Sequence, residues 1–203
     1  MKSSRTRERG AAAPPFTAYP ELVEGLPLFC HPDTPATKVT GVNARLVVGN
    51  HARLVLDFHI IAPPDALYLP QSDAPERRDG LWHTTCLEMF VGARDQPYYD
   101  EYNYSPSGAW AAYHFLAYRA GMVAMDTAAP PVVRVEVGNS STLIRIDDAF
   151  PTARYESVKL GLSAVIEETD GTKSYWALCH PPGPPDFHHP DCFALTIEAA
   201  ERS

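Results

Sequence analysis

The chain has 203 residues, of which 45% are hydrophobic and 21% charged, and it carries a net charge of -8. That length is typical of one all-β domain, and the acidic balance excludes the basic surface that nucleic-acid binding needs. No run of about 18 apolar residues occurs, so a membrane-spanning helix is not expected. The 20 prolines disfavour long helices and favour short strands joined by loops.

The N-terminal segment, residues 1–35, is rich in Pro, Ala and charge and shows little periodicity. We expect it to be a disordered tail and linker, followed by one domain over residues 36–199. The opening MKSSRTRERGAAAPP is basic but lacks the apolar stretch of a secretory signal. We therefore expect a cytoplasmic protein, and its four cysteines, which form no CxxC pair, should be reduced.

From Val39 onward the apolar residues recur with a period of two, which is typical of strands. In RLVLDFHII (53–61), Leu54, Leu56, Phe58 and Ile60 share the face expected to be buried. Turn residues such as Gly49-Asn50, Ser105–Gly108, Gly138–Ser141 and Thr169–Gly171 separate the strand-like segments. The further strands are expected at 41–48, 84–91, 98–104, 109–118, 132–137, 142–147, 158–168, 173–179 and 192–198. Roughly nine or ten short strands predict an all-β fold, an antiparallel β-sandwich of the jelly-roll kind.

The segment YYDEYNYSPSGAW (98–110) combines aromatic and hydrogen-bonding residues. Strand alternation places Tyr98, Asp100, Tyr102 and Tyr104 on one face and Tyr99, Glu101 and Asn103 on the other. One interpretation is an outer sheet whose tyrosines pack inward and whose carboxylates are solvated. The other is a binding surface, because aromatic rings stack on the C–H faces of a sugar while carboxylate and amide groups bind its hydroxyls.

The segment GLWHTTCLEMF (80–90) supports the second interpretation. Trp82 stands where a strand begins, so its ring can line a cleft at the edge of the sheet. Glu88 lies on the face opposite Met89, and a buried carboxylate there needs a hydrogen-bond donor. Arg77, Arg78 or a ligand hydroxyl could supply it.

Taken together, LW, CLEMFV, YYDEYNYSPSG, AW and YWALCHPPGPPDFHHPDCFALTIE resemble the DOMON-like relatives of the family 9 carbohydrate-binding modules. The resemblance covers roughly Val39 to Glu198. It implies a β-sandwich that binds a small polar ligand, with a sugar as the candidate, which the sugar-binding members hold between two tryptophans. From the charge and the lack of a long apolar run we expect no nucleic-acid or membrane partner, and with no GxSxG or P-loop motif in the sequence we assign no catalytic residue.

The resemblance also implies site residues. Trp82 matches the first tryptophan, Glu88 the acidic residue after it, and Asn103 the asparagine of the next strand. Two positions depart from the pattern: Glu101 stands where the family has an arginine, and Phe187 with His188 and His189 stands where a second tryptophan is expected. The ligand-binding residues we predict are therefore Trp82, Glu88, Glu101, Asn103, Phe187 and His188.

Three alternatives use other chemistry. The loop from His180 to Cys192 contains His, Cys and Asp side chains that could bind a metal, although none has established zinc spacing. A haem, bound by Met and His as in cytochrome-type DOMON domains, would make the chain a redox protein, but none of Met89, Met122 and Met125 matches those ligand positions. Glu88 with Glu101 or Asp100 could form a two-carboxylate glycosidase site. We predict a non-catalytic domain without metal or cofactor, and keep a haem- or metal-binding redox protein as the alternative.

Overall fold

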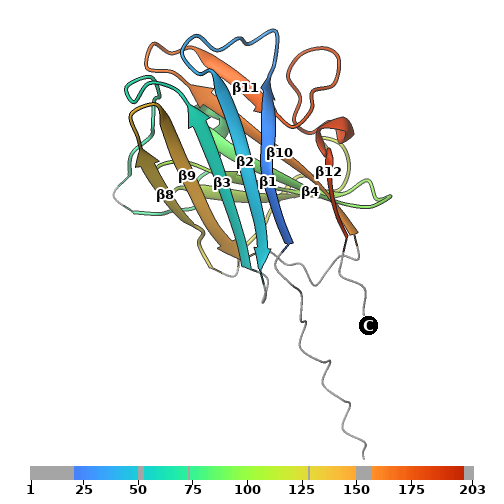
Figure 1. The fold of residues 1–203 in the computed structure, drawn as a ribbon. Coiled ribbons are helices and arrows are strands. Elements are labelled where there is room, and N and C mark those ends of the chain that lie inside the picture. Colours follow the sequence, from blue (N-terminus) through green and yellow to red (C-terminus); the bar gives the residue numbers. More distant parts are fainter. Residues whose placement is uncertain (1–20, 50–52, 73, 128, 150–156, 199–203) are drawn as a thin grey trace, which may run out of the picture.

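The computed structural model describes residues 21–49, 53–72, 74–127, 129–149 and 157–198. These residues form twelve strands in one continuous sheet (Figure 1). The strands are β1 (Glu21–Cys30), β2 (Gly41–Gly49), β3 (Arg53–Ile61), β4 (Cys86–Ala93), β5 (Tyr99–Tyr104), β6 (Trp110–Phe115), β7 (Val123–Ala124), β8 (Val132–Val137), β9 (Ser141–Ala149), β10 (Ser157–Glu167), β11 (Lys173–Ala177) and β12 (Leu195–Glu198). Two short 3-10 helices, η2 (Leu81–His83) and η4 (Pro190–Cys192), complete the described elements. None of the helices in these ranges has the length and apolar character that crossing a membrane requires.

The sheet runs in the order β7-β6-β5-β4-β10-β11-β1-β2-β3-β9-β8, and β12 pairs with β10 beside this path. Every pairing between these strands is antiparallel. The prediction of an all-β antiparallel fold is confirmed, and twelve strands replace the nine or ten that were expected.

The sheet curls so that two halves pack against each other. In Figure 1, β8, β9, β3, β2 and β1 lie side by side as the front half, while β4 and β10 pass behind them. We call β7, β6, β5, β4, β10, β11 and β12 the back half. Strand β1 joins the halves, because it pairs with β2 over most of its length and with β11 through Phe29 and Cys30.

The predicted start of the domain at residue 36 is too late, because β1 already belongs to the sheet. The segment 1–35 was expected to be tail and linker, yet Glu21–Cys30 is a strand within the sheet; residues 1–20 lie outside the described part of the chain. The register of β1 against β2 shifts between Val23 and Leu26, and Gly25 has a φ of 66°. Such a bulge breaks the alternation of period two, which is why the sequence pattern did not reveal the strand.

The hydrophobic core fills the space between the two halves. The face of β3 predicted to be buried lies in it, with Leu56, Phe58 and Ile60 fully shielded from solvent. The back half contributes Met89, Tyr104 and Trp176 among others. Burial of this apolar surface is the main term that holds the curled sheet together.

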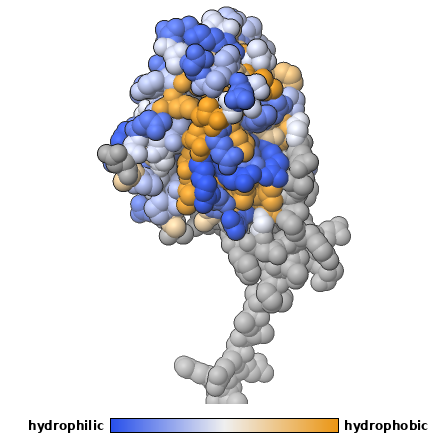
Figure 2. Space-filling view, turned by 60° about the vertical axis from the view of Figure 1, so that its left-hand side comes forward, coloured by the Kyte–Doolittle hydropathy of each residue, from blue (hydrophilic) through white to orange (hydrophobic). Residues whose placement is uncertain are grey.

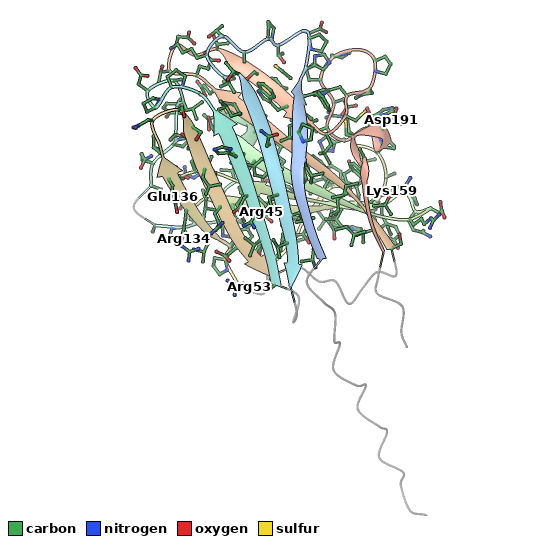
Figure 3. All side chains as sticks on the ribbon, viewed as in Figure 1. Arg45, Arg53, Arg134, Glu136, Lys159 and Asp191 are labelled. Atoms are coloured by element: carbon green, nitrogen blue, oxygen red, sulfur yellow. The ribbon has the colours of Figure 1, made fainter. Side chains whose placement is uncertain are left out.

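The outward face of the front half is covered by charged pairs. Asp57 accepts hydrogen bonds from Arg45 at 2.7 Å and from Arg145 at 2.7 Å. Arg53 and Arg134 bind Asp147 from two neighbouring strands, and Figure 3 shows both arginines on this half. The space-filling view in Figure 2 shows hydrophilic residues interrupting the hydrophobic ones over this side of the molecule.

The outward face of the back half differs, because it carries a second apolar cluster. Phe90, Tyr99, Tyr113 and Phe115 pack there on the face opposite the main core. Phe187, from the loop 178–194 between β11 and β12, lies over the same cluster. This covered face is where the predicted site residues come together.

Candidate functional site

The floor of the candidate site is formed by β4 and β5. Glu88 pairs directly with Asn103 across these strands, and Glu101 lies two residues further along on the same face. Their neighbours Met89 and Tyr102 point into the main core, as the alternation predicted. Two carboxyl groups and an amide, separated in the sequence, thus share one patch of the outward sheet face.

One wall is formed by η2, which carries Trp82. The side chain of Trp82 is 38% exposed, whereas the other two tryptophans, Trp110 and Trp176, are buried in the core. The indole meets the ring of Tyr113 edge-on, with centroids 6.3 Å apart. Tyr113 is itself fixed, since its hydroxyl donates a 2.7 Å hydrogen bond to Asp79. The exposed indole face is therefore presented by a supported aromatic pair.

The opposite wall is the loop 178–194, which is tied to the sheet by its ends and its centre. His31 donates from Nε2 to the carbonyl of Gly183 at 2.9 Å, since its Nδ1 accepts from the Asp33 N–H. Phe193 lies on the sheet where glycine replaces a side chain: a Cβ at Gly161 would stand 3.0 Å from its ring. These contacts hold the loop at a fixed height above the floor.

Asp186 anchors the middle of the loop. Its carboxylate accepts a 2.7 Å hydrogen bond from Arg119 and another from the Tyr118 hydroxyl. Burial acts to raise the pKa of Asp186, but the hydrogen bonds from Tyr118 and Arg119 outweigh it and leave this pKa below its usual value. The carboxylate is thus charged, and its neighbours Phe187 and His188 are presented to the site.

Floor and walls enclose a hollow of about 440 Å³ that is open to solvent. Its lining residues are Trp82, Glu88, Glu101, Tyr113, Phe115, Arg119, Met122, Val165, Tyr175, Pro185, Phe187 and His188. Five of the six predicted site residues belong to this lining. The sixth, Asn103, is fully buried beneath it and donates a 2.7 Å hydrogen bond to Glu101 Oε1.

The two carboxyl groups are more enclosed than a solvated surface would allow. Glu88 is 3% exposed and Glu101 is 5% exposed, so the interpretation as solvated carboxylates on an outer sheet is wrong. Burial, and next the neighbouring Glu101, raise the pKa of Glu88 well above its usual value. Burial also raises the pKa of Glu101, against the opposing effect of the hydrogen bond from Asn103.

The donor expected for Glu88 is not an arginine. Arg77 pairs with Asp79 and lies over the Tyr113 ring, while Arg78 pairs with Glu76. Ser163 Oγ, on the adjacent β10, donates to Glu88 Oε2 at 3.4 Å instead. Each arginine pairs with a carboxylate two positions away in the sequence, and neither donates to Glu88.

The ring N–H of His188 points toward Glu101. The Tyr99 hydroxyl accepts from the Arg119 N–H and donates to His188 Nδ1, 2.8 Å away. Nε2 therefore carries the proton of the neutral ring, and it lies 3.9 Å from Glu101 Oε2. Burial, followed by the charge of Arg119, lowers the pKa of His188 to about 4. A neutral imidazole thus offers one N–H beside a carboxylate oxygen.

Arg119 and Tyr175 are lining residues that the sequence prediction missed. Arg119 enters from the turn after β6 with a φ of 51°, and it brings a guanidinium to the lining of the hollow. Nothing periodic marks this turn. Tyr175 could have been found, because it is the neighbour of core-facing Trp176 in β11 and so faces the opposite side.

The residues considered for a metal or haem have other partners. Among the described residues, no three His, Cys, Asp or Glu side chains gather as metal ligands. His180 bonds to the Phe29 carbonyl at 2.8 Å, and the Cys192 thiol donates to the Asp186 carbonyl. Met89 is enclosed in the core, whereas Met122 is exposed beside the hollow.

Comparison with known proteins identifies the fold. No protein-family model and no curated protein matches the sequence. A solved structure from Bacteroides uniformis, described as a candidate carbohydrate-binding protein, matches with a TM-score of 0.62 at 13% identity, over 88% of this chain and 86% of that chain. This likeness shows a shared fold.

Two further matches are structures of a family 9 carbohydrate-binding module from Caldicellulosiruptor kristjanssonii. The complex with glucose matches with a TM-score of 0.48 at 11% identity, over 83% of this chain and 81% of that chain. The complex with cellotriose has the same TM-score and identity and covers 83% and 79% of the two chains. Family 9 modules are thus among the structures that this chain resembles, while the DOMON-like relation stays a prediction.

Proposed function

We propose that this chain is a non-catalytic carbohydrate-binding domain and that the hollow beside Trp82 is its sugar site. The observation that carries the proposal is that a half-exposed indole and two buried carboxyl groups line the same hollow. Its volume of about 440 Å³ falls within the range of small-molecule sites, roughly 300–1,000 Å³.

Each lining group has a role in this proposal. Trp82 stacks on the C–H face of a pyranose ring, and Phe187 covers the ring from the loop side. Glu88 and Glu101 accept hydrogen bonds from hydroxyls, and His188 Nε2 donates one. Asn103 acts through Glu101, because its amide holds Glu101 Oε1 in place. The relative from Bacteroides uniformis, described as a candidate carbohydrate-binding protein, supports the same assignment.

We propose that the two carboxyl groups bind hydroxyls and do not hydrolyse a glycosidic bond, because both lie on the floor of a hollow that an exposed indole also lines. We therefore expect the chain to show no turnover of an aryl glycoside.

The test is isothermal titration of the protein with a panel of mono- and disaccharides. We expect at least one sugar to bind, and Trp82→Ala to weaken that binding about tenfold or more, since a buried aromatic contact is worth roughly 1.5–3 kcal/mol. Tyr68→Ala is the matched control, because Tyr68 is also an exposed aromatic, at 47%, and lies outside the lining. Absence of binding across the panel, or equal binding by parent and Trp82→Ala, would reject the proposal.

A further inference from the structure

Two carboxylate oxygens at the floor of the hollow lack a donor. Within the described part of the chain, Glu88 accepts a hydrogen bond only from Ser163, at Oε2, so its Oε1 has none. Glu101 uses Oε1 for Asn103, and His188 Nε2 lies 3.9 Å from its Oε2, beyond hydrogen-bond length. Both residues are more than nine-tenths buried and line the hollow.

Among the described residues, no cationic side chain donates a hydrogen bond to these oxygens. Burial keeps His188 neutral, with a pKa of about 4. Arg119 is the one arginine among the described lining residues, and its charge opposes the rise in the pKa of Glu101. Its guanidinium, however, is held by Asp186 through hydrogen bonds of 2.7 and 3.2 Å. Ser163 and Asn103, the other groups that contact the pair, are neutral. A ligand that carries its own positive charge could therefore donate hydrogen bonds to Glu88 Oε1 and Glu101 Oε2, which no cation among the described residues occupies.

The rest of the lining also favours a cation. Trp82, Tyr113, Phe115, Tyr175 and Phe187 surround the floor with aromatic rings. The faces of such rings attract ammonium groups, by about 2 kcal/mol when the site is desolvated. The net charge of -8 adds a field that draws cations toward the protein.

We propose that the ligand of this site is an amino sugar whose protonated amine binds between Glu88 and Glu101. This inference rests on the proposed function and deepens it, since it names the class of sugar. The amine donates to the open oxygens of the two carboxyl groups, while the sugar ring lies against Trp82.

Binding of such a ligand changes the protonation of the floor. Glu88 and Glu101 are diagonal neighbours on one face of adjacent strands, so their charges repel and the pair retains a proton when empty. An ammonium group placed between them stabilises the ionised form. The carboxyl proton is then released to the buffer, while the amine keeps its own proton and its charge.

The experiment compares matched sugars by isothermal titration: glucosamine with glucose, galactosamine with galactose, and mannosamine with mannose. Each is titrated in two buffers of different ionisation enthalpy at about pH 6, where an amine with a pKa near 8 is protonated. We expect one amino sugar to bind at least about tenfold more tightly than its hydroxyl counterpart, a ratio equal to about 1.4 kcal/mol. Its binding should release protons, whereas binding of the counterpart should not.

Glu88→Gln and Glu101→Gln test the assignment separately, in case one of them fails to fold. Each should reduce the ratio of amino-sugar to neutral-sugar affinity toward one and abolish the proton release. Glu136→Gln is the matched control, since Glu136 lies exposed on β8 in the front half (Figure 3). This variant should keep the affinity ratio and the proton release of the parent.

The outcomes separate the two proposals. Neutral sugars that bind as tightly as their amino counterparts would overturn the amine inference and leave the sugar-binding function standing. Failure of every sugar in the set to bind would overturn both. An amino-sugar preference that survives in both glutamine variants would also overturn the assignment to Glu88 and Glu101.

Discussion

The hydroxyl of Tyr99 and Nδ1 of His188 lie 2.8 Å apart, and this contact joins β5 to the loop that closes the candidate site. It sets the tautomer of His188, so that the ring N–H points toward Glu101. The same ring packs against Phe90 and Phe115, with centroids 5.2 and 5.1 Å away. The position of a predicted ligand contact thus depends on a tyrosine in the sheet.

Removal of the Tyr99 hydroxyl should weaken both the loop and the site. In Tyr99→Phe the buried Nδ1 loses its donor, which should cost about 1 kcal/mol of unfolding free energy. The affinity for a bound sugar should fall severalfold, because the His188 ring is then free to adopt other orientations. Urea unfolding and titration measure the two effects. The control is Tyr98→Phe, whose exposed ring lies on the other face of the strand; equal effects in both variants would contradict the account.

Loss of the Asp186 charge should release the loop from Arg119 and Tyr118. We expect Asp186→Asn to lower sugar affinity and to speed chymotrypsin cleavage at Phe187, which is buried in the parent. Because the pKa of Asp186 is lowered in the folded protein, its contribution is present above the unfolded pKa and is lost as the pH falls through the folded one. Asp191→Asn, an exposed change in the same loop, should leave the cleavage rate unaltered; acceleration by both would argue against Asp186 as the anchor.

Glu88 should make the folded protein less stable as the pH rises. Its folded pKa is raised by burial and by Glu101, so the folded state binds its proton more tightly than the unfolded state does. Stability from this group is complete below the unfolded pKa, about 4.3, and declines as the pH rises toward the folded value. Glu88→Gln should therefore gain stability relative to the parent with rising pH, as measured by urea unfolding at a series of pH values. A constant difference between the two proteins would show that Glu88 is not perturbed.

Glu168 should be the most sensitive acidic residue for stability outside the site. Its Oε1 accepts backbone hydrogen bonds from Thr37 at 2.8 Å, Lys38 at 2.9 Å and Val39 at 3.3 Å. We expect Glu168→Ala to lower the unfolding free energy by about 2–4 kcal/mol, since several donors lose a charged acceptor. Glu136→Ala, at an exposed position, provides the comparison. A loss no larger than that of the comparison would refute the role.

Strand alternation explains why so much of the site could be predicted. Successive side chains in a strand point to opposite faces, so Met89 in the core requires Glu88 outside, and Tyr102 in the core requires Glu101 outside. Trp82 was located differently, by its position at the end of a loop shortly before a strand, and it lies in η2 ahead of β4. The alternation in the sequence therefore predicts which sheet face Glu88 and Glu101 occupy.

The parts that could not be predicted depend on non-periodic backbone. Arg119 lies in a turn at positive φ, and its approach to the hollow is set by Asp186, which is distant in sequence. Strand β1 contains a bulge near Gly25, which hides its alternation. Turns and bulges are fixed by tertiary contacts, and a single sequence does not reveal those.

The most direct test uses the fluorescence of Trp82, since Trp110 and Trp176 are buried and Trp82 alone of the three is exposed. The protein is titrated with the monosaccharide that binds most tightly in the panel, and the emission of the parent is compared with that of Trp82→Phe. Stacking of the sugar on the indole predicts a saturable shift to shorter wavelength in the parent and none in the variant. An unchanged parent spectrum at saturation, or the same shift in Trp82→Phe, would contradict a sugar site at this indole.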